Sequence, residues 1–435
     1  MSLPFVKKLI NSKLSTTLVL QMAAILVGLL SHYFFTQWMG ETKYGYYAFG
    51  LSMLTIFTLV AKLGLDVGVL RFLPEEINQK AYGNVIGYLV FSISLIILTA
   101  LLVLLGLKVL LQFEALQESN FYIIYTFLLA LPFKAIIDYN AYLYQNFNKV
   151  SYSIIHKSIF LPILFCVLLF CFYQTADSFE RIAHLYILAI TGVCFSSLFF
   201  LKNTPIRDFF RVKPSFKASE WLKVTIWLAI IDNIQYWLSD TDIFMLGLFS
   251  TPEQIGIYSI GVKISAISTI GVTAVNFLLA PRISKLFYNN KVEEIEKTLE
   301  EYVPFLALYA VTFVIGAVFL GKFILSIFGA SYVEAYIPML ILVGSKIFLT
   351  ILGPVSYMLS LTGKEKFVFA INFAAVLVNI SLNFFLIQAF GIIGAAIGTA
   401  VAIGVRGTIL SIVVKRHLKI KLLPELMLKR FFNFK

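Results

Sequence analysis

Nine ionisable residues lie deep inside apolar stretches of this sequence, where a charge is expensive. Six of them are bases, Lys62, Lys134, Lys157, Lys263, Lys346 and Arg406, and three are acids, Asp66, Asp138 and Asp232. A charge at the centre of a membrane helix costs about 2.5–3.5 kcal/mol on insertion scales and normally faces a polar interior. The surplus of bases predicts a cationic cavity for an anionic ligand, because lysine and arginine are both good partners for phosphate.

Two of the acids follow a base by four residues, in the pairs Lys62–Asp66 and Lys134–Asp138. Residues at i and i+4 share one face of a helix, so each pair also fits a purely structural role. The three acids, Asp66, Asp138 and Asp232, are our candidates for coupling transport to protons or sodium ions.

The bases Lys157, Lys346 and Arg406 have no carboxylate at this spacing, which favours a role in binding the ligand. The alternative is that their long side chains extend along the helix toward the membrane surface. Tertiary contacts have to decide between these two interpretations.

The composition indicates what must position these charges. Of the 435 residues, 60% are hydrophobic and only 13% are charged, against about 45–50% and about 25% in soluble domains. A soluble chain of this size could not cover so much apolar surface. The composition excludes a soluble enzyme, a disordered chain and a disulfide-stapled domain, and it predicts a polytopic membrane protein.

Twelve windows have the length and apolar character of membrane-spanning helices. They cover residues 15–36, 46–69, 84–108, 121–143, 150–173, 182–201, 221–249, 257–280, 303–328, 336–361, 368–388 and 394–414. Segments of this length favour helices over the short alternating strands of a barrel. We therefore predict an all-α fold with about 12 transmembrane helices.

Lysine and arginine concentrate in alternate loops and at both ends of the chain. The opposite loops hold only Lys43, Lys108, Arg181 and Lys322. The positive-inside rule then places both termini in the cytoplasm. The net charge of +12 therefore reflects membrane topology, and no nucleic-acid partner is predicted.

The two halves of the sequence carry related motifs. The stretch GETKYGYYAFG follows the first window and TPEQIGIYSIG follows the seventh, which aligns Gly45 with Gly256 and Tyr47 with Tyr258. Six windows in each half make the repeat parallel, an arrangement in which two bundles rock about a site between them. The predicted divisions are two six-helix bundles at 1–201 and 220–414, a basic linker at 202–219 and a basic tail at 415–435.

Further motifs connect the chain to a known family. They are VLRFLPEE at 69–76, Asp242 ahead of FMLGLF, and NISLNFFLIQAFGIIGAAIGTAVA at 379–402. With the glycine–tyrosine repeat, they resemble the oligosaccharide flippases (O-antigen and capsule exporters) of the superfamily that also contains MATE drug antiporters and lipid II flippases. The resemblance implies transfer of polyprenyl-pyrophosphate-linked oligosaccharides across a bacterial inner membrane, for envelope polysaccharide synthesis.

Several alternatives stand beside this interpretation. A MATE-type ion-coupled drug antiporter should have an acidic cavity, and a polysaccharide polymerase should have a long outside loop. No Walker motif is present, and the three cysteines and four histidines lack metal-ligand spacing. We therefore predict no enzyme activity and no cofactor. The predicted partners are the lipid-linked oligosaccharide, the bilayer, H⁺ or Na⁺, and the polysaccharide polymerase machinery.

Overall fold

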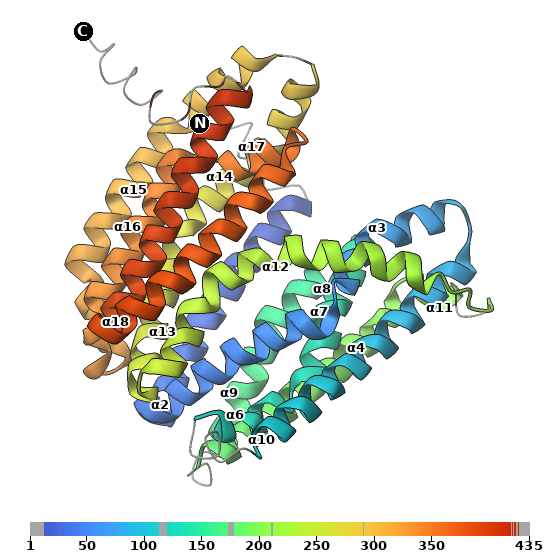
Figure 1. Cartoon of the computed structure of the whole chain (residues 1–435), viewed down its shortest axis with the longest axis horizontal. Helices are drawn as coiled ribbons and strands as arrows, with labels where there is room; N and C mark the ends of the chain where they lie inside the picture. Colours follow the sequence, from blue (N-terminus) through green and yellow to red (C-terminus); the bar gives the residue numbers. More distant parts are fainter. Residues whose placement is uncertain are drawn as a thin grey trace. The chain divides into compact units, whose positions relative to one another are not determined.

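The computed structural model describes residues 13–112, 120–172, 178–209, 212–289 and 291–418, together with Ile420, Leu422 and Glu425. Every regular element in these residues is a helix (Figure 1). The chain divides into unit 1 (Met1–Asn233) and unit 2 (Ile234–Lys435), with the boundary inside the helix α12 (Ala218–Phe249). The predicted all-α membrane fold is confirmed, and the exact domain limits stay a prediction.

Unit 1 is built from the helices of the first half of the chain. They are α2 (Lys13–Lys62), α3 (Leu65–Asn78), α4 (Tyr82–Leu110), α6 (Asn120–Leu128), α7 (Leu131–Asn146), α8 (Val150–Ile154), the π-helix η1 (Ile155–Phe160), α9 (Leu161–Cys171), α10 (Phe179–Phe200), η3 (Leu201–Asn203), α11 (Ile206–Phe209) and the first part of α12. Its core contains Leu65, Tyr88, Tyr139 and Trp221, so the start of α12 is buried among α3, α4 and α7.

Unit 2 continues from the second part of α12. Its helices are α13 (Pro252–Ala266), η4 (Ile267–Thr269), α14 (Ile270–Tyr288), α15 (Val292–Phe328), η5 (Ser331–Ala335), α16 (Tyr336–Leu352), α17 (Val355–Leu361) and α18 (Glu365–Leu418). Leu279, Leu299, Met358 and Val414 lie in its main apolar core, which joins α14, α15, α17 and α18. Helices α15, α16 and α18 pack in sequence across this unit (Figure 1).

Two long helices each cover two predicted windows. Helix α2 is broken at Gly40 (φ 70°) and α18 at Gly391 (φ 56°), in backbone conformations that glycine adopts without steric cost. Among the described residues, eight helices are long and apolar enough to cross a membrane. The count is lower than twelve because these two helices are merged, because the window at 121–143 is divided into α6 and α7, and because α12 is more polar.

The connection into α12 is attached to unit 1. The Ser215 amide donates a hydrogen bond to the Gly83 carbonyl (2.9 Å), and the Lys217 ammonium lies 3.0 Å from a Glu76 carboxylate oxygen. The hydrogen bond to Glu76 raises the pKa of Lys217 above its usual value. Any stability linked to this shift is present at neutral pH and is lost only in alkaline solution, above about pH 10.

Helix α4 offers a matched test of this attachment. A Cβ added at Gly87 would overlap the Ser215 backbone, whereas one added at Gly106 meets nothing within 4 Å. We expect Gly87→Ala to destabilise the detergent-solubilised protein by about 1–3 kcal/mol, because overpacking forces the backbone to move. Gly106→Ala should stabilise it by up to about 1 kcal/mol through helix propensity. Melting curves of both variants check this prediction. If the Gly87→Ala and Gly106→Ala variants melt at the same temperature, the Ser215 backbone is not packed tightly against α4.

Candidate functional site

Asp138 on α7 is held between two lysines. Its Oδ2 lies 2.5 Å from the Nζ of Lys134, one turn earlier on the same helix. Its Oδ1 lies 3.0 Å from the Nζ of Lys157, which comes from a different helix. The expected i,i+4 pair forms, and a second base joins it through the tertiary structure. Asp138 and Lys134 are largely buried, whereas the Lys157 side chain is 41% exposed.

Lys157 owes its position to an irregular helix. Residues Ile155–Phe160 form a π-helix, a wider turn that is frequently found at functional sites. The neighbouring His156 is buried, with Nδ1 2.8 Å from the Tyr152 carbonyl oxygen and Nε2 3.2 Å from the Ser196 hydroxyl. These contacts fix the wide turn, so the backbone holds Lys157 in place beside Asp138.

Lys62 and Asp66 form a second buried ion pair in unit 1. The sequence predicted that Lys62 and Asp66 lie on one face of a single helix, and this prediction is wrong. Lys62 ends α2, Asp66 lies in the first turn of α3, and Gly64 between them is left-handed (φ 72°). A Cβ at Gly64 would collide with the backbone of Thr225 on α12. The close approach of α12 therefore requires glycine and breaks the helix.

The two ion pairs belong to one group. Lys62 interacts electrostatically with Asp138 and with Lys157 as well as with Asp66. We call Lys62, Asp66, Lys134, Asp138 and Lys157 the unit 1 charge cluster. Three bases against two acids leave it with a formal charge of +1, and its most exposed lysine is Lys157.

The bases of unit 2 have mainly uncharged hydrogen-bond partners. The Lys346 ammonium donates to the buried Ser265 hydroxyl (2.7 Å), and the Arg406 Nε donates to the Asn372 amide oxygen (2.7 Å). Lys263 on α13 instead interacts with a carboxylate, that of Asp240. Lysine has three donor hydrogens and arginine five, so each of these bases can hold a ligand in addition to its partner.

A buried polar network in unit 2 surrounds Asp242. Its Oδ2 accepts hydrogen bonds from the Tyr258 hydroxyl (2.5 Å) and the Thr399 hydroxyl (3.5 Å). The Asn379 amide donates to Thr399 (3.1 Å), and the Asn383 amide donates to Asn379 (3.2 Å). We call these five residues the Asp242 network; all of them are buried and they come from α12, α13 and α18.

The Asp242 network has the chemistry of a site for a proton or a small hard cation. It offers one carboxylate with hydroxyl and amide oxygens around it, and such cations prefer oxygen ligands. Among the described residues, no group of three or more His, Cys, Asp or Glu side chains could hold a metal ion. A single carboxylate suits a monovalent ion or a proton better than a divalent metal.

Family profiles match most of the chain. Residues 11–287 match the family described as polysaccharide biosynthesis protein, and residues 228–385 match the MatE family. The first match covers more than half of the sequence. The chain belongs to the polysaccharide biosynthesis protein family.

Two curated relatives of this polysaccharide biosynthesis protein come from Haloferax volcanii. The probable low-salt glycan biosynthesis flippase Agl15 is 27% identical over 195 residues, and the probable flippase AglR is 28% identical over 193 residues. The matches cover 44% and 43% of this chain and 41% and 39% of the relatives. The matched part of the chain thus spans about two fifths of the length of these relatives.

Solved structures with similar folds include two transporters of the MOP superfamily and a lipid II flippase. An inward-facing multidrug resistance MATE transporter superposes with a TM-score of 0.75 at 11% identity, covering 91% of this chain and 94% of that one. The lipid II flippase MurJ gives 0.72 at 16% identity, covering 92% and 87%. A Pyrococcus furiosus transporter, described as having a binding pocket of reverse polarity, gives 0.61 at 12% identity, covering 93% and 94%. These likenesses establish the fold.

The sequence named most bases of this polysaccharide biosynthesis protein but missed one network. Asp242, Tyr258, Asn379 and Asn383 lie in the motifs that carried the family resemblance, yet the candidate coupling acids were Asp66, Asp138 and Asp232. The signal in the sequence that could have indicated this network is the presence of several polar residues within the apolar segments that contain those motifs. The Asp232 side chain lies outside the described part of the structure.

Proposed function

We propose that this protein is a flippase that moves lipid-linked oligosaccharides across the membrane by alternating access. Its family, its glycan-flippase relatives and its MurJ-like fold support transport of a lipid-linked glycan. The observation that carries the proposal is the set of bases inside both units, which suits a pyrophosphate group. The same proposal includes four further points: the glycan is built into O-antigen or capsule, the membrane is a bacterial inner membrane, both termini are cytoplasmic, and the protein contacts a polysaccharide polymerase.

Three bases are best suited to contact the anionic substrate. The Lys157 side chain is substantially exposed although its ammonium group contacts Asp138, so it can bind a phosphate while it stays beside Asp138. Lys346 and Arg406 have hydroxyl and amide hydrogen-bond partners, which do not neutralise their charge. Lys62 and Lys134 are paired with buried carboxylates, and their main effect is to keep the cluster positive. Lys263 interacts with Asp240 and contributes positive charge in unit 2.

The drug-antiporter alternative fits the charges less well. A site for cationic drugs needs accessible, unpaired acids, whereas Asp66 and Asp138 are each neutralised by lysines and Asp242 is buried. A reconstituted vesicle assay separates the two functions, using a fluorescent lipid-linked oligosaccharide and a membrane-impermeant quencher. Movement of the glycolipid supports the flippase. Accumulation of a cationic dye without movement of the glycolipid would overturn it.

We also propose that Asp242 is the ion-coupling residue, in place of Asp66 and Asp138. Its hydrogen bonds come from neutral hydroxyl and backbone groups, so its carboxylate remains available for H⁺ or Na⁺. Its charge also interacts with Lys346. Binding of a cation at Asp242 would remove that attraction and free Lys346 for the substrate, which links the ion to the transported molecule.

An ion-gradient experiment tests this assignment. We expect glycolipid movement to fall when both proton and sodium gradients are collapsed by ionophores. Asp242→Asn should remove the gradient effect, because a neutral amide cannot bind the coupling cation in the same way. Glu334→Gln, a change of an exposed acid in the same unit, is the matched control. A gradient effect that survives in Asp242→Asn would place the coupling elsewhere.

A further inference from the structure

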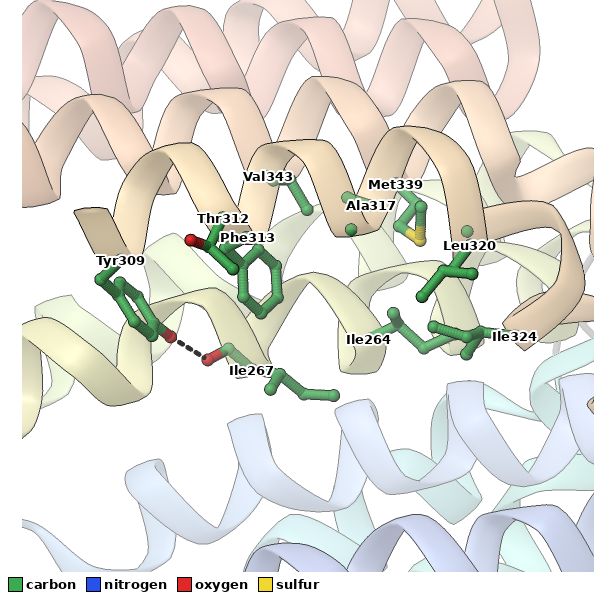
Figure 2. A pocket seen from close by; sticks show the side chains of 12 residues that line it. Ile264, Ile267, Tyr309, Thr312, Phe313, Ala317, Leu320, Ile324, Met339 and Val343 are labelled. Atoms are coloured by element: carbon green, nitrogen blue, oxygen red, sulfur yellow. Dashed lines mark hydrogen bonds between the residues drawn. The ribbon is translucent and has the colours of Figure 1, made fainter. Parts of the chain in front are cut away.

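An apolar pocket of about 330 Å³ lies in unit 2. Its walls are Ile264 on α13, Ile267 in η4, one face of α15 between residues 309 and 324, and Met339 and Val343 on α16 (Figure 2). Pockets that bind small ligands begin at about 300 Å³. This one therefore has room for part of a hydrocarbon chain.

Small residues on α15 create the pocket. Gly316, Ala317 and Gly321 leave a notch where larger side chains would fill the space. A Cβ added at Gly316 would meet no atom within 4 Å, so this position opens directly into the pocket.

The Tyr309 hydroxyl at the pocket wall is already used within the protein. The Tyr309 hydroxyl donates a hydrogen bond to the Ile267 carbonyl (3.1 Å), as Figure 2 shows. That carbonyl lies in the short 3-10 turn after α13, where the regular helical bonding is interrupted. Of the other lining residues only Thr312 has a polar side chain, so the surface left for a ligand is mainly hydrocarbon.

A cation lies beside this hydrocarbon surface. Val343 is one helical turn before Lys346 on α16, and Ile264 and Ile267 flank Ser265, which accepts the hydrogen bond of Lys346. The same two helices thus present an apolar pocket and an ammonium group next to each other. This combination suits an amphiphile with an apolar chain and a phosphate at its head.

We propose that the pocket binds the first isoprenoid units of the lipid carrier while Lys346 contacts its phosphate. The proposal rests on the proposed function, because it takes the substrate to be lipid-linked. The pocket is too small for a whole polyprenyl chain, so the remaining chain stays in the bilayer. An isoprenoid phosphate, rather than a bulk phospholipid, is the occupant to which we commit.

The test is photo-crosslinking of the purified full-length protein in nanodiscs. The probe is a polyprenyl phosphate with a diazirine in its first isoprene units, and labelled peptides are located by mass spectrometry. We expect labelling of α15 between residues 309 and 324. Excess unlabelled polyprenyl phosphate should suppress it at least tenfold, and phosphatidylglycerol at equal concentration should not. Equal competition by both lipids, or labelling elsewhere, would overturn the assignment.

Leucine substitutions at two glycines, one inside the pocket and one outside it, provide a matched pair of variants. Gly316→Leu places a side chain into open space and should reduce the labelling about tenfold. Gly344→Leu on α16 also meets no atom within 4 Å, but Gly344 does not line the pocket, so labelling should persist. Unchanged labelling in Gly316→Leu would contradict the proposal. The competition experiment on the unmodified protein remains decisive if Gly316→Leu does not fold.

The binding readout is independent of transport. If the unmodified protein is labelled in the pocket but moves no glycolipid, the proposed function fails and the pocket site stands. If it moves glycolipid but labelling falls outside α15, the pocket assignment fails alone.

Discussion

Replacing Lys346 with alanine is expected to reduce glycolipid movement at least tenfold while the protein still inserts in the membrane. A charge-assisted hydrogen bond contributes about 1.5–3 kcal/mol, and each 1.4 kcal/mol is a factor of ten. Reconstituted flipping and the amount of surface glycan in cells are the two measurements. Lys346→Arg should retain part of the activity, because it keeps the positive charge but changes the position of the donors.

Arg406→Ala should behave like Lys346→Ala, because Arg406 is likewise held by a neutral partner inside unit 2. Lys322→Ala is the matched control: this lysine lies on α15 near the Tyr336 ring and is not among the predicted cavity bases. We expect it to leave transport unchanged. Glycan at the unmodified level in both Lys346→Ala and Arg406→Ala, with normal insertion, would contradict the cationic site.

Asp138→Asn is expected to cause the largest loss of stability. The substitution removes the carboxylate from two lysines at once, and Lys134 is largely buried. Removing one partner of a buried ion pair costs about 3–5 kcal/mol, because the remaining charge is left uncompensated. The half-exposed Lys157 should add little to this cost, because solvent screens it. For a unit of this size we expect a fall of roughly 10 °C in melting temperature.

The double variant Lys134→Met/Asp138→Leu is the control for this prediction. Replacing a buried ion pair by apolar residues of similar volume is often neutral or stabilising. Its melting temperature should therefore recover toward that of the unmodified protein. A single variant Asp138→Asn that melts normally would show that the pair contributes nothing measurable.

Local features of the fold could be predicted because they depend only on neighbouring residues. The length of an apolar segment sets whether it can cross a membrane, so the helical class and most of the predicted windows follow from composition along the chain. The Lys134–Asp138 pair is local in the same way, since both residues lie on one turn of α7. The family motifs in both halves are likewise short runs of consecutive residues.

Contacts between distant helices could not be predicted in this way. Nothing in the sequence around Lys157 indicates a π-helix, and its contact with Asp138 arises only because α7 and that helix pack together. The break between Lys62 and Asp66 depends on the close approach of α12 to Gly64. Both depend on which helix surfaces meet, and residue spacing does not contain that information.

The sequence alone therefore determined the membrane class, the helices and the positive charge of this protein, because hydrophobic length and charge count are properties of single segments. Only the tertiary structure decided which charges are neutralised and which remain available. It joined Asp242, Tyr258 and Asn379 from three helices into one network. The physical reason is that ion pairs and hydrogen bonds act over about 3 Å, a distance that folding sets between residues far apart in the chain.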